Sequence, residues 1–164
     1  MIELTPLDRD EWMPRVRVYV LTAVSEAREA IEELTRLERL QISIQSLYLV
    51  AEKDPHAEWP EGYIVRSMWE PCDIIGWADA VTRPERAAEL SWETAVKFRG
   101  HGYMREAAPR IAEWLLRRRG MNVVTALIPG GDTSSEKVAL ACGLSPTGQS
   151  SPTTGMRMWT RTAT

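Results

Sequence analysis

The feature that most constrains the fold of this chain is the glycine-rich stretch at residues 96–104, which joins a strand-like segment to a helix-like one. Residues 88–96 alternate between apolar and polar side chains, as half-buried strands do, and residues 104–119 carry apolar side chains at helical spacing. Gly100 and Gly102 lack a Cβ where the chain must turn, and the first turn of a helix presents unpaired N–H groups. This arrangement can hold a phosphate, although any tight connection between a strand and a helix also favours glycine.

Two helices and two strands are predicted from the turn onwards. Residues 104–119 form the clearest helix in the sequence, and residues 122–128 form a run typical of a buried strand. Asp132 or Thr133 can cap the second helix, which ends at Gly143. A polar loop and a final strand follow, at residues 147–155 and 156–161.

The first part of the chain predicts an edge strand followed by helices. Residues 2–7 alternate in polarity like a short strand. A first helix can begin at Asp8 or Asp10, and its apolar face consists of Trp12, Val16, Tyr19 and Ala23. Ser25 can cap a second, longer helix, and residues 41–50 favour its continuation over a strand.

The remaining segment completes the predicted order of elements. Residues 54–62 form a loop by composition, and two strands follow at residues 63–68 and 74–81. A length of 164 residues suits one domain with a single core. We therefore expect an α/β fold of the α+β type, in which helices flank a mixed sheet.

The composition is that of an ordinary soluble globular protein, with 44% hydrophobic and 26% charged residues. The net charge of −3 provides no basic field that favours nucleic acid, and the basic run at residues 117–119 suits a helix C-terminus. No apolar run approaches the roughly 18 residues that span a membrane, and no signal peptide is visible. Cys72 and Cys142 lack metal-ligand spacing and fit reduced thiols. We therefore expect a cytoplasmic protein with no metal, no nucleic-acid partner and no membrane association.

Two signatures give the chain a resemblance to a known family. Residues 97–102 match the pattern Gln or Arg, any two residues, Gly, any residue, then Gly or Ala, with Lys97 in the first position. Residues 132–144 are similar to N-x-x-S-x-x-V-A-x-x-x-G-F, with Asp132 and Leu144 as departures. In this order the two signatures resemble those of the GNAT superfamily, the acyl-CoA-dependent N-acyltransferases.

The resemblance is firm over residues 88–144, and residues 102–107 look most like the Rim-type branch, the ribosomal-protein N-terminal acetyltransferases. It is weak before residue 62, where acceptor substrates are usually recognised. It implies a twisted, mostly antiparallel sheet of about six to seven strands flanked by about four helices, in one acyltransferase domain over residues 1–164. It also implies an acetyl-CoA-dependent N-acetyltransferase.

The resemblance assigns residues to the donor, acetyl-CoA. In the family the donor's pyrophosphate lies on the backbone amides of the glycine turn. The residues so assigned are Arg99, Gly100, His101, Gly102 and Tyr103. The pantetheine arm follows the strand end at Ala95 and Val96, where a bulge separates this strand from residues 122–128 and an N–H faces the thioester oxygen. The second signature adds Asp132 and Ser135 to the donor site.

The residues that transfer protons follow from the same resemblance. Many GNAT enzymes protonate the leaving thiolate with a Tyr of the second signature, but that position is Ala139 here. Ser135 is the remaining hydroxyl that matches the family pattern, and the resemblance makes it the candidate acid. Alternatively, Ser135 is an ordinary residue of the first helical turn, and Asp132 is an ordinary N-cap. Glu89 and Glu93 share one face of the strand and are candidate general bases, unless they form a solvated face. Glu89 is the first candidate, because it lies closest to the usual position of the base in the family, and Glu93 is the second.

One histidine and three tryptophans also have expected places. We expect His101 to point out of the turn as a bystander and Trp92 to lie in the core. Trp59 or Trp69 is a candidate wall of an acceptor cleft.

The activity that the resemblance implies is transfer of an acetyl group to a primary amine by direct attack in a ternary complex. The acceptor is a small amine, an antibiotic or a peptide or protein N-terminus. A non-catalytic acyl-CoA-binding sensor or partner subunit is the alternative, because the usual Tyr is missing. Family analogy adds a homodimer.

Overall fold

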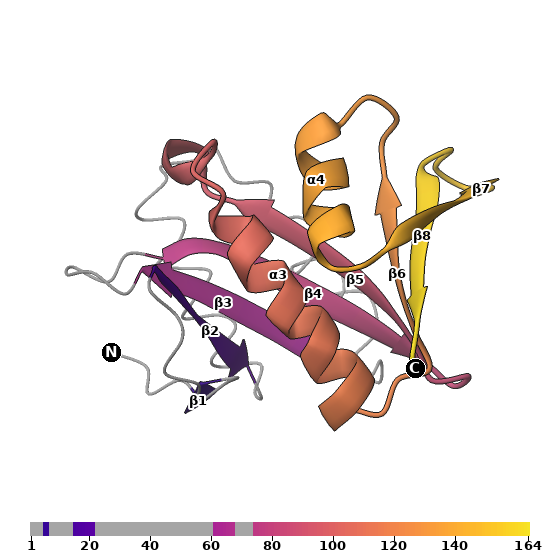
Figure 1. Cartoon of the computed structure of the whole chain (residues 1–164), viewed down its shortest axis with the longest axis horizontal. Helices are drawn as coiled ribbons and strands as arrows, with labels where there is room; N and C mark the ends of the chain where they lie inside the picture. The colour runs from indigo at the N-terminus through magenta and orange to yellow at the C-terminus, as the bar shows by residue number, and fades with distance from the viewer. Residues whose placement is uncertain (1–4, 7–14, 22–60, 68–73) are drawn as a thin grey trace.

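The computed structural model describes residues 5–6, 15–21, 61–67 and 74–164. Eight strands form one sheet in the order β1-β2-β3-β4-β5-β6-β8-β7, and two α-helices pack beside it (Figure 1). The strands are β1 (Thr5–Pro6), β2 (Val16–Leu21), β3 (Glu61–Ser67), β4 (Ile74–Arg83), β5 (Ala87–Thr94), β6 (Val123–Ile128), β7 (Ser145–Ser150) and β8 (Arg157–Thr162). The helical segments are the 3-10 turn η1 (Val96–Phe98), α3 (Tyr103–Glu113), its π-helical continuation η2 (Trp114–Arg118) and α4 (Thr133–Ala141).

Neighbouring strands are antiparallel except for β5 and β6, which are parallel and connected through α3 and η2. Residues 87–89 of β5 pair with residues 123–125 of β6, but β5 continues to Thr94 and β6 to Ile128. Figure 1 shows the two strands meeting at one end and separating at the other, with α4 beside the wider end. The predicted separation of these strands is therefore confirmed.

The main core lies between the sheet and α3. The helix buries Met104, Ala107, Ala108, Ile111 and Ala112, and it packs across β2 to β5. A large side chain such as that of Ile111 contributes roughly 2 kcal/mol by this burial. Small alanine side chains on the same face allow the helix to lie close to the strands. The strands supply Val16, Val18, Tyr63, Val65, Ala78, Ala80, Ala88 and Leu90.

Helix α3 and η2 confirm the helix predicted at residues 104–119, with one irregularity. Pro109 lies inside α3, where it cannot donate a hydrogen bond to the carbonyl one turn earlier. The helix continues to Glu113 and then widens, so that the Arg119 N–H donates to the Trp114 carbonyl at 3.0 Å. The start of the helix, which borders the glycine turn, keeps regular geometry.

Part of the helix predicted from Asp8 or Asp10 through Ala23 is wrong, because residues 16–21 form strand β2 between β1 and β3. Val16 and Tyr19 have helical spacing, but valines at alternate positions also fit a pleated strand. Six residue pairs with β3 favour the strand, which buries Val16 and Val18. The second predicted helix, at residues 25–50, lies outside the described residues.

The loop predicted at residues 147–155 is wrong in its first part, where β7 pairs with β8. Every residue of β7 is exposed, so the strand carries no apolar alternation that a sequence could display. Its pairing uses backbone groups and shifts register between Pro146 and Ser150. This strand and β2 raise the total to eight, and the predicted α+β class with a mostly antiparallel sheet is confirmed. The strands predicted at 63–68, 74–81, 88–96, 122–128 and 156–161 correspond to β3, β4, β5, β6 and β8.

Candidate functional site

The glycine turn has the left-handed backbone that its sequence requires. Gly100 and Gly102 have φ angles of 80° and 77°, which residues with a Cβ adopt at a cost. Gly102 is the N-cap of α3 and provides no side chain to accept from the first N–H groups of the helix. These N–H groups therefore remain directed at whatever lies before the helix.

The strand end before the turn corrects two expectations. The register of β4 with β5 is unbroken over eight residue pairs, so the expected bulge is absent from β5 as far as Thr94. The Ala95 N–H donates to the Ile75 carbonyl at 2.7 Å and is therefore not directed at a donor thioester. Among the residues that the structure describes, the Val96 N–H has no hydrogen-bond acceptor, and it is the remaining candidate.

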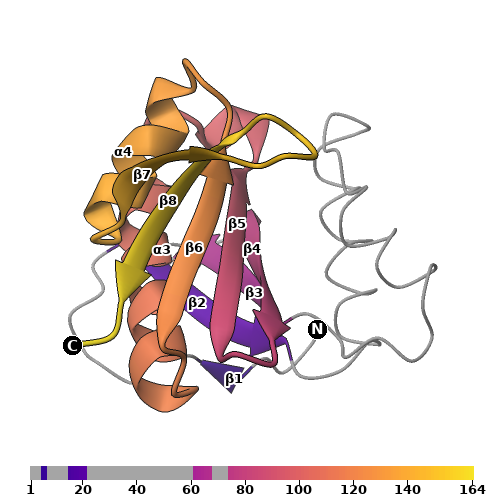
Figure 2. The same cartoon turned by 90° about the vertical axis from the view of Figure 1, so that its right-hand side faces the viewer.

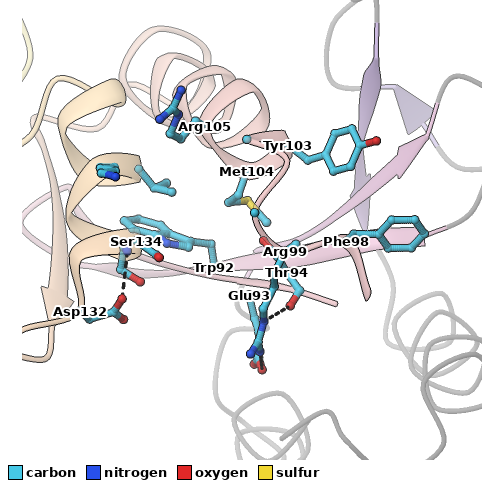
Figure 3. Close-up of a pocket in the computed structure, with 15 residues that line it drawn as sticks. Trp92, Glu93, Thr94, Phe98, Arg99, Tyr103, Met104, Arg105, Asp132 and Ser134 are labelled. Carbon is cyan, nitrogen blue, oxygen red and sulfur yellow. Dashed lines mark hydrogen bonds and ion pairs between the residues drawn. The ribbon is translucent and has the colours of Figure 1, made fainter. Parts of the chain in front are cut away.

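A cavity of about 600 Å³ lies where β5 and β6 have separated. Its walls come from the end of β5, the glycine turn and the first turns of α3 and α4 (Figure 3). This volume is within the range of small-molecule sites. The lining residues are Trp92, Glu93, Thr94, Phe98, Arg99, Gly100, Gly102, Tyr103, Met104, Arg105, Asp132, Ser134, Ser135, Lys137 and Val138.

Two helix N-termini border this one cavity, and both favour an anionic ligand. At α4, the Asp132 carboxylate accepts a hydrogen bond from the Ser135 N–H at 3.1 Å, so its role as N-cap is confirmed (Figure 3). Ser135 lies in the first turn and borders the cavity. The cations Arg105 of α3 and Lys137 of α4 line the cavity as well.

Glu93 and Arg99 form an ion pair at the end of β5. The Arg99 Nη2 lies 3.6 Å from the Glu93 Oε1, and the Arg99 Nε donates to the Thr94 carbonyl at 3.0 Å. Figure 3 shows both side chains extending together, away from α3. Burial raises the pKa of Glu93 above its ordinary value, and the Arg99 guanidinium opposes that rise.

Glu89 lies apart from the cavity, although it shares a strand face with Glu93. It is the last β5 residue that pairs with β6, and its carboxylate lies 3.4 Å from the Arg83 guanidinium. The structure therefore brings Glu93, and not Glu89, to the cavity wall. Trp92, expected in the core, is half-buried: it packs against the core and also borders the cavity.

His101 is exposed and does not line the cavity. Its Nδ1 lies 2.9 Å from the Arg99 carbonyl oxygen, and its ring stacks on Tyr103 with centroids 5.6 Å apart. Ala95 and Val96 flank the cavity without lining it. Trp59, Trp69 and Cys72 lie outside the described residues.

Asp79 is a buried carboxylate that the sequence interpretation missed. It lies on β4 directly opposite Ser91, is 8% exposed, and accepts a hydrogen bond from the Ser91 Oγ at 2.6 Å. Burial raises its pKa, the Ser91 hydrogen bond opposes that rise and the Glu89 charge adds to it. Alternation along β5 places Glu89, Ser91 and Glu93 on one face, so Asp79 extends this acidic face across two strands. The register of the β4–β5 hairpin was the sequence signal for this pair.

Residues 5–6, 15–21, 61–67 and 74–164 contain no group of three or more His, Cys, Asp or Glu side chains placed to hold a metal ion. No helix within these ranges has the length and apolarity to span a membrane. Cys142 is buried, which raises the pKa of its thiol to about 12.

Solved structures of distant sequence share the fold. The ribosomal-protein-S5-alanine acetyltransferase from Vibrio fischeri has a TM-score of 0.69 and 16% identity, over 94% of this chain and 97% of that chain. The spermidine/spermine N-acetyltransferase SpeG from Vibrio cholerae has a TM-score of 0.64 and 13% identity, over 90% and 94%. An acetyltransferase of the GNAT family from Bacillus anthracis has a TM-score of 0.61 and 16% identity, over 88% and 92%. At these identities the likeness supports the fold.

A match over most of the sequence identifies the family. No protein with a curated description matches it. Residues 4–145, most of the chain, match the family described as "Acetyltransferase (GNAT) domain". This match covers the glycine turn, the separated strands and both helices that border the cavity. The chain therefore belongs to the GNAT acetyltransferase family, whose members use acetyl-CoA as co-substrate.

Proposed function

We propose that the protein transfers an acetyl group from acetyl-CoA to a primary amine by direct attack in a ternary complex. The observation that carries this proposal is the single cavity in which the glycine turn, the α4 N-terminus and Glu93 meet. Donor binding, leaving-group protonation and amine deprotonation can therefore occur within one cavity.

The phosphates of the donor bind at the N-terminus of α3. Support comes from the left-handed glycines, from the uncapped N–H groups and from Arg105 and Lys137 on the cavity walls. The acyl-CoA signature also fits residues 99–104, where Arg99 takes the first position and the N-cap Gly102 takes the obligatory glycine. In that placement Met104 stands in the last, usually small position, and its side chain is buried.

The pantetheine arm pairs with the edge of β5 that β6 has left. This edge is free of β6 beyond Glu89, so backbone groups there can bond the amides of the arm as a strand would. The Val96 N–H then stabilises the negative charge that develops on the thioester oxygen, a contribution on the order of 3 kcal/mol.

The chemistry requires one base and one acid. The amine nitrogen attacks the thioester carbon, its proton passes to Glu93, and the C–S bond breaks. The thiolate takes a proton from Ser135, and solvent then returns a proton to Ser135 as Glu93 releases its own, so that both side chains regain their starting states. Ser135 is the candidate acid because the position of the usual Tyr is Ala139, which is fully buried. Glu93 is preferred to Glu89 because it lines the cavity.

A cationic amine is the acceptor class that the charges favour. Asp79, Glu89 and Glu93 share one face of β4 and β5, and that face lies next to the cavity. A polyamine, an antibiotic amine and a protein N-terminus all satisfy this chemistry. The titles of two structural neighbours name spermidine/spermine and ribosomal-protein alanine acetylation for those proteins.

The cellular setting is proposed on narrower grounds. We infer a cytoplasmic protein because the buried Cys142 is a free thiol, as reducing compartments favour. A single catalytic domain over residues 1–164 that forms a homodimer follows from family analogy, and sedimentation analysis tests the dimer.

The test measures thiol release from acetyl-CoA with a panel of amines, together with donor affinity by calorimetry. We expect turnover with cationic amines, and we expect Gly100→Glu to weaken CoA binding by about 100-fold, or about 2.7 kcal/mol, through overlap and charge repulsion with phosphate. Gly148→Glu is the matched control, because Gly148 also has positive φ, no neighbour within 4 Å of an added Cβ and a place on exposed β7. CoA binding without turnover for any amine identifies the sensor alternative.

A further inference from the structure

Arg99 connects the glycine turn to the end of β5. Its backbone belongs to the glycine turn, but its side chain reaches back to the end of β5, where it contacts Thr94 and Glu93 (Figure 3). The Arg99 side chain is 55% exposed, and its guanidinium has no second carboxylate within ion-pair distance among the described residues. Such an exposed pair contributes little to stability, so Arg99 can exchange these partners at low cost.

The Thr94 carbonyl faces the open edge of β5. In an antiparallel pair, successive residues direct their backbone groups alternately towards and away from the partner strand. Ala95 bonds Ile75 of β4, so the groups of Thr94 are directed away from β4, on the side that β6 has left. The Arg99 Nε therefore occupies an acceptor that an extended ligand pairing with this edge requires.

The Arg99 guanidinium favours the charged form of the Glu93 carboxylate. Trp77 of β4 lies directly opposite Glu93 and brings no charge. Burial favours the protonated acid, and Arg99 is the cation that opposes this effect. Among the described residues, the other charged side chains of the cavity wall are Arg99 in the turn, Arg105 on α3, the α4 N-cap Asp132 and Lys137 on α4. Glu89 on β5 and Asp79 on β4 share the strand face of Glu93.

We propose that Arg99 is a positioning residue that couples donor binding to the proton affinity of Glu93. The pantetheine arm takes the Thr94 carbonyl from Arg99, and the donor's phosphates attract the freed guanidinium back to the turn. Glu93 then loses its counter-charge and binds a proton more strongly, which makes it a better base towards an ammonium acceptor. The inference rests on the proposed use of acetyl-CoA at this site.

The experiment follows the protonation of Glu93 directly. The side-chain carboxyl carbons of glutamate are labelled with ¹³C, the Glu93 resonance is identified by its loss in Glu93→Gln, and its pH titration is recorded with and without CoA. We expect CoA to move the titration midpoint to higher pH. The phosphates raise the midpoint by their own field as well, so the coupling is the part of the shift that depends on Arg99.

Variants separate these contributions. In Arg99→Gln the midpoint without CoA is already higher, and CoA moves it by roughly half as much or less, because the counter-charge is absent. Arg99→Lys, which keeps the charge without the planar fork, restores part of the shift. Arg105→Gln is the matched control, since it removes a cavity cation that is not paired with Glu93, and it retains the full shift at saturating CoA. Melting curves verify that each variant is folded.

Two results distinguish the failure of each idea. If calorimetry shows that CoA binds the wild type but the midpoint shift is equal in wild type and Arg99→Gln, the coupling is wrong and the proposed function stands. If CoA does not bind the wild type at all, the proposed function is wrong and the coupling falls with it.

Discussion

Strand β5 has two neighbours and contacts them very differently. Its pairing with β4 is unbroken over eight residue pairs and continues at Ala95, whereas its pairing with β6 ends after three. Strand β5 lies between β4 and β6 in the sheet (Figure 2). Its edge towards β4 is paired along the strand, whereas its edge towards β6 is left open beyond Glu89, beside the cavity. The comparison teaches that a binding site can be made by ending a strand pair early, provided that the opposite edge keeps the strand in place.

The largest expected effect comes from disrupting the pairing of β4 with β5 at Gly76. An added Cβ would overlap the Glu93 carbonyl oxygen and lie 3.1 Å from the Thr94 Cα, so the two strands must separate. We expect Gly76→Ala to destabilise the fold by about 3 kcal/mol, a fall in Tm of roughly 6–12 °C. Thermal melts measure this, with Gly130→Ala as the control, because Gly130 has no positive φ and an added Cβ there lies 3.6 Å from its nearest neighbour. An unchanged Tm contradicts the closeness of the β4–β5 contact.

The second prediction compares two carboxylates on the same strand face. Glu89 lies where β6 still pairs, and Glu93 lies where β6 has left. We expect Glu93→Gln to lower kcat by about 100-fold, because the amine loses its proton acceptor, and Glu89→Gln to stay within a few-fold of wild type. Initial rates with saturating acetyl-CoA decide between them. A stronger effect at Glu89 reverses the assignment of the base.

The third prediction concerns the helix across the open edge. We expect Ser135→Ala to lower kcat by about 10-fold while the affinity for CoA stays close to wild type, since the hydroxyl acts on the leaving thiolate. The backbone N–H that Asp132 accepts from is retained in this variant, so the cap and the helix remain. Calorimetry and steady-state rates test the two halves. Wild-type rates make Ser135 a structural first-turn residue.

The smallest expected effect is at Asp79, on the strand β4 that pairs with β5. Because burial raises its pKa in the folded state above the ordinary 3.8, the folded protein binds this proton more tightly than the unfolded chain does. Stability therefore increases as the pH falls through the raised pKa towards 3.8, and it is lower near neutral pH. Asparagine is neutral and can still accept from Ser91, so Asp79→Asn should stabilise the protein near neutral pH by on the order of 1 kcal/mol, about 2–4 °C in Tm.

The comparison for this variant is a melt in mildly acidic buffer, where the wild-type carboxyl is protonated. The gain from Asp79→Asn should shrink there, because both side chains are then neutral. A gain that is the same at both pH values shows that the wild-type carboxylate carries no burial cost.

The parts of the fold that the sequence predicted are those in which local pattern and tertiary packing agree. The start of α3 has apolar positions at helical spacing and a glycine N-cap, and both requirements are met in one place. The prediction for β2 was wrong because its apolar residues fit both a helical and a strand period. Pairing with β3, which begins at Glu61, decides between the two. The prediction for β7 was wrong because this strand pairs with β8 through its backbone, and its exposed side chains show no apolar alternation.

The site divides in the same way. The glycines, the Asp132 cap and Ser135 followed from local sequence, because each acts within a few residues of its own position. The choice between Glu89 and Glu93 depends on where β6 leaves β5, which is a contact between distant segments. Arg99 was assigned to the donor through its backbone amide, and its side-chain contacts depend on the conformation of the turn.

The alanines on α3 have a consequence beyond packing. Because Ala107, Ala108 and Ala112 set how close the helix axis lies to the sheet, they also set the height of its first turn above the end of β5. The width of the cavity therefore depends on side chains that do not line it. A larger side chain at these core positions should change the affinity for the donor without contacting it. Substitutions in the glycine turn and in this part of the core are therefore expected to occur together in evolution.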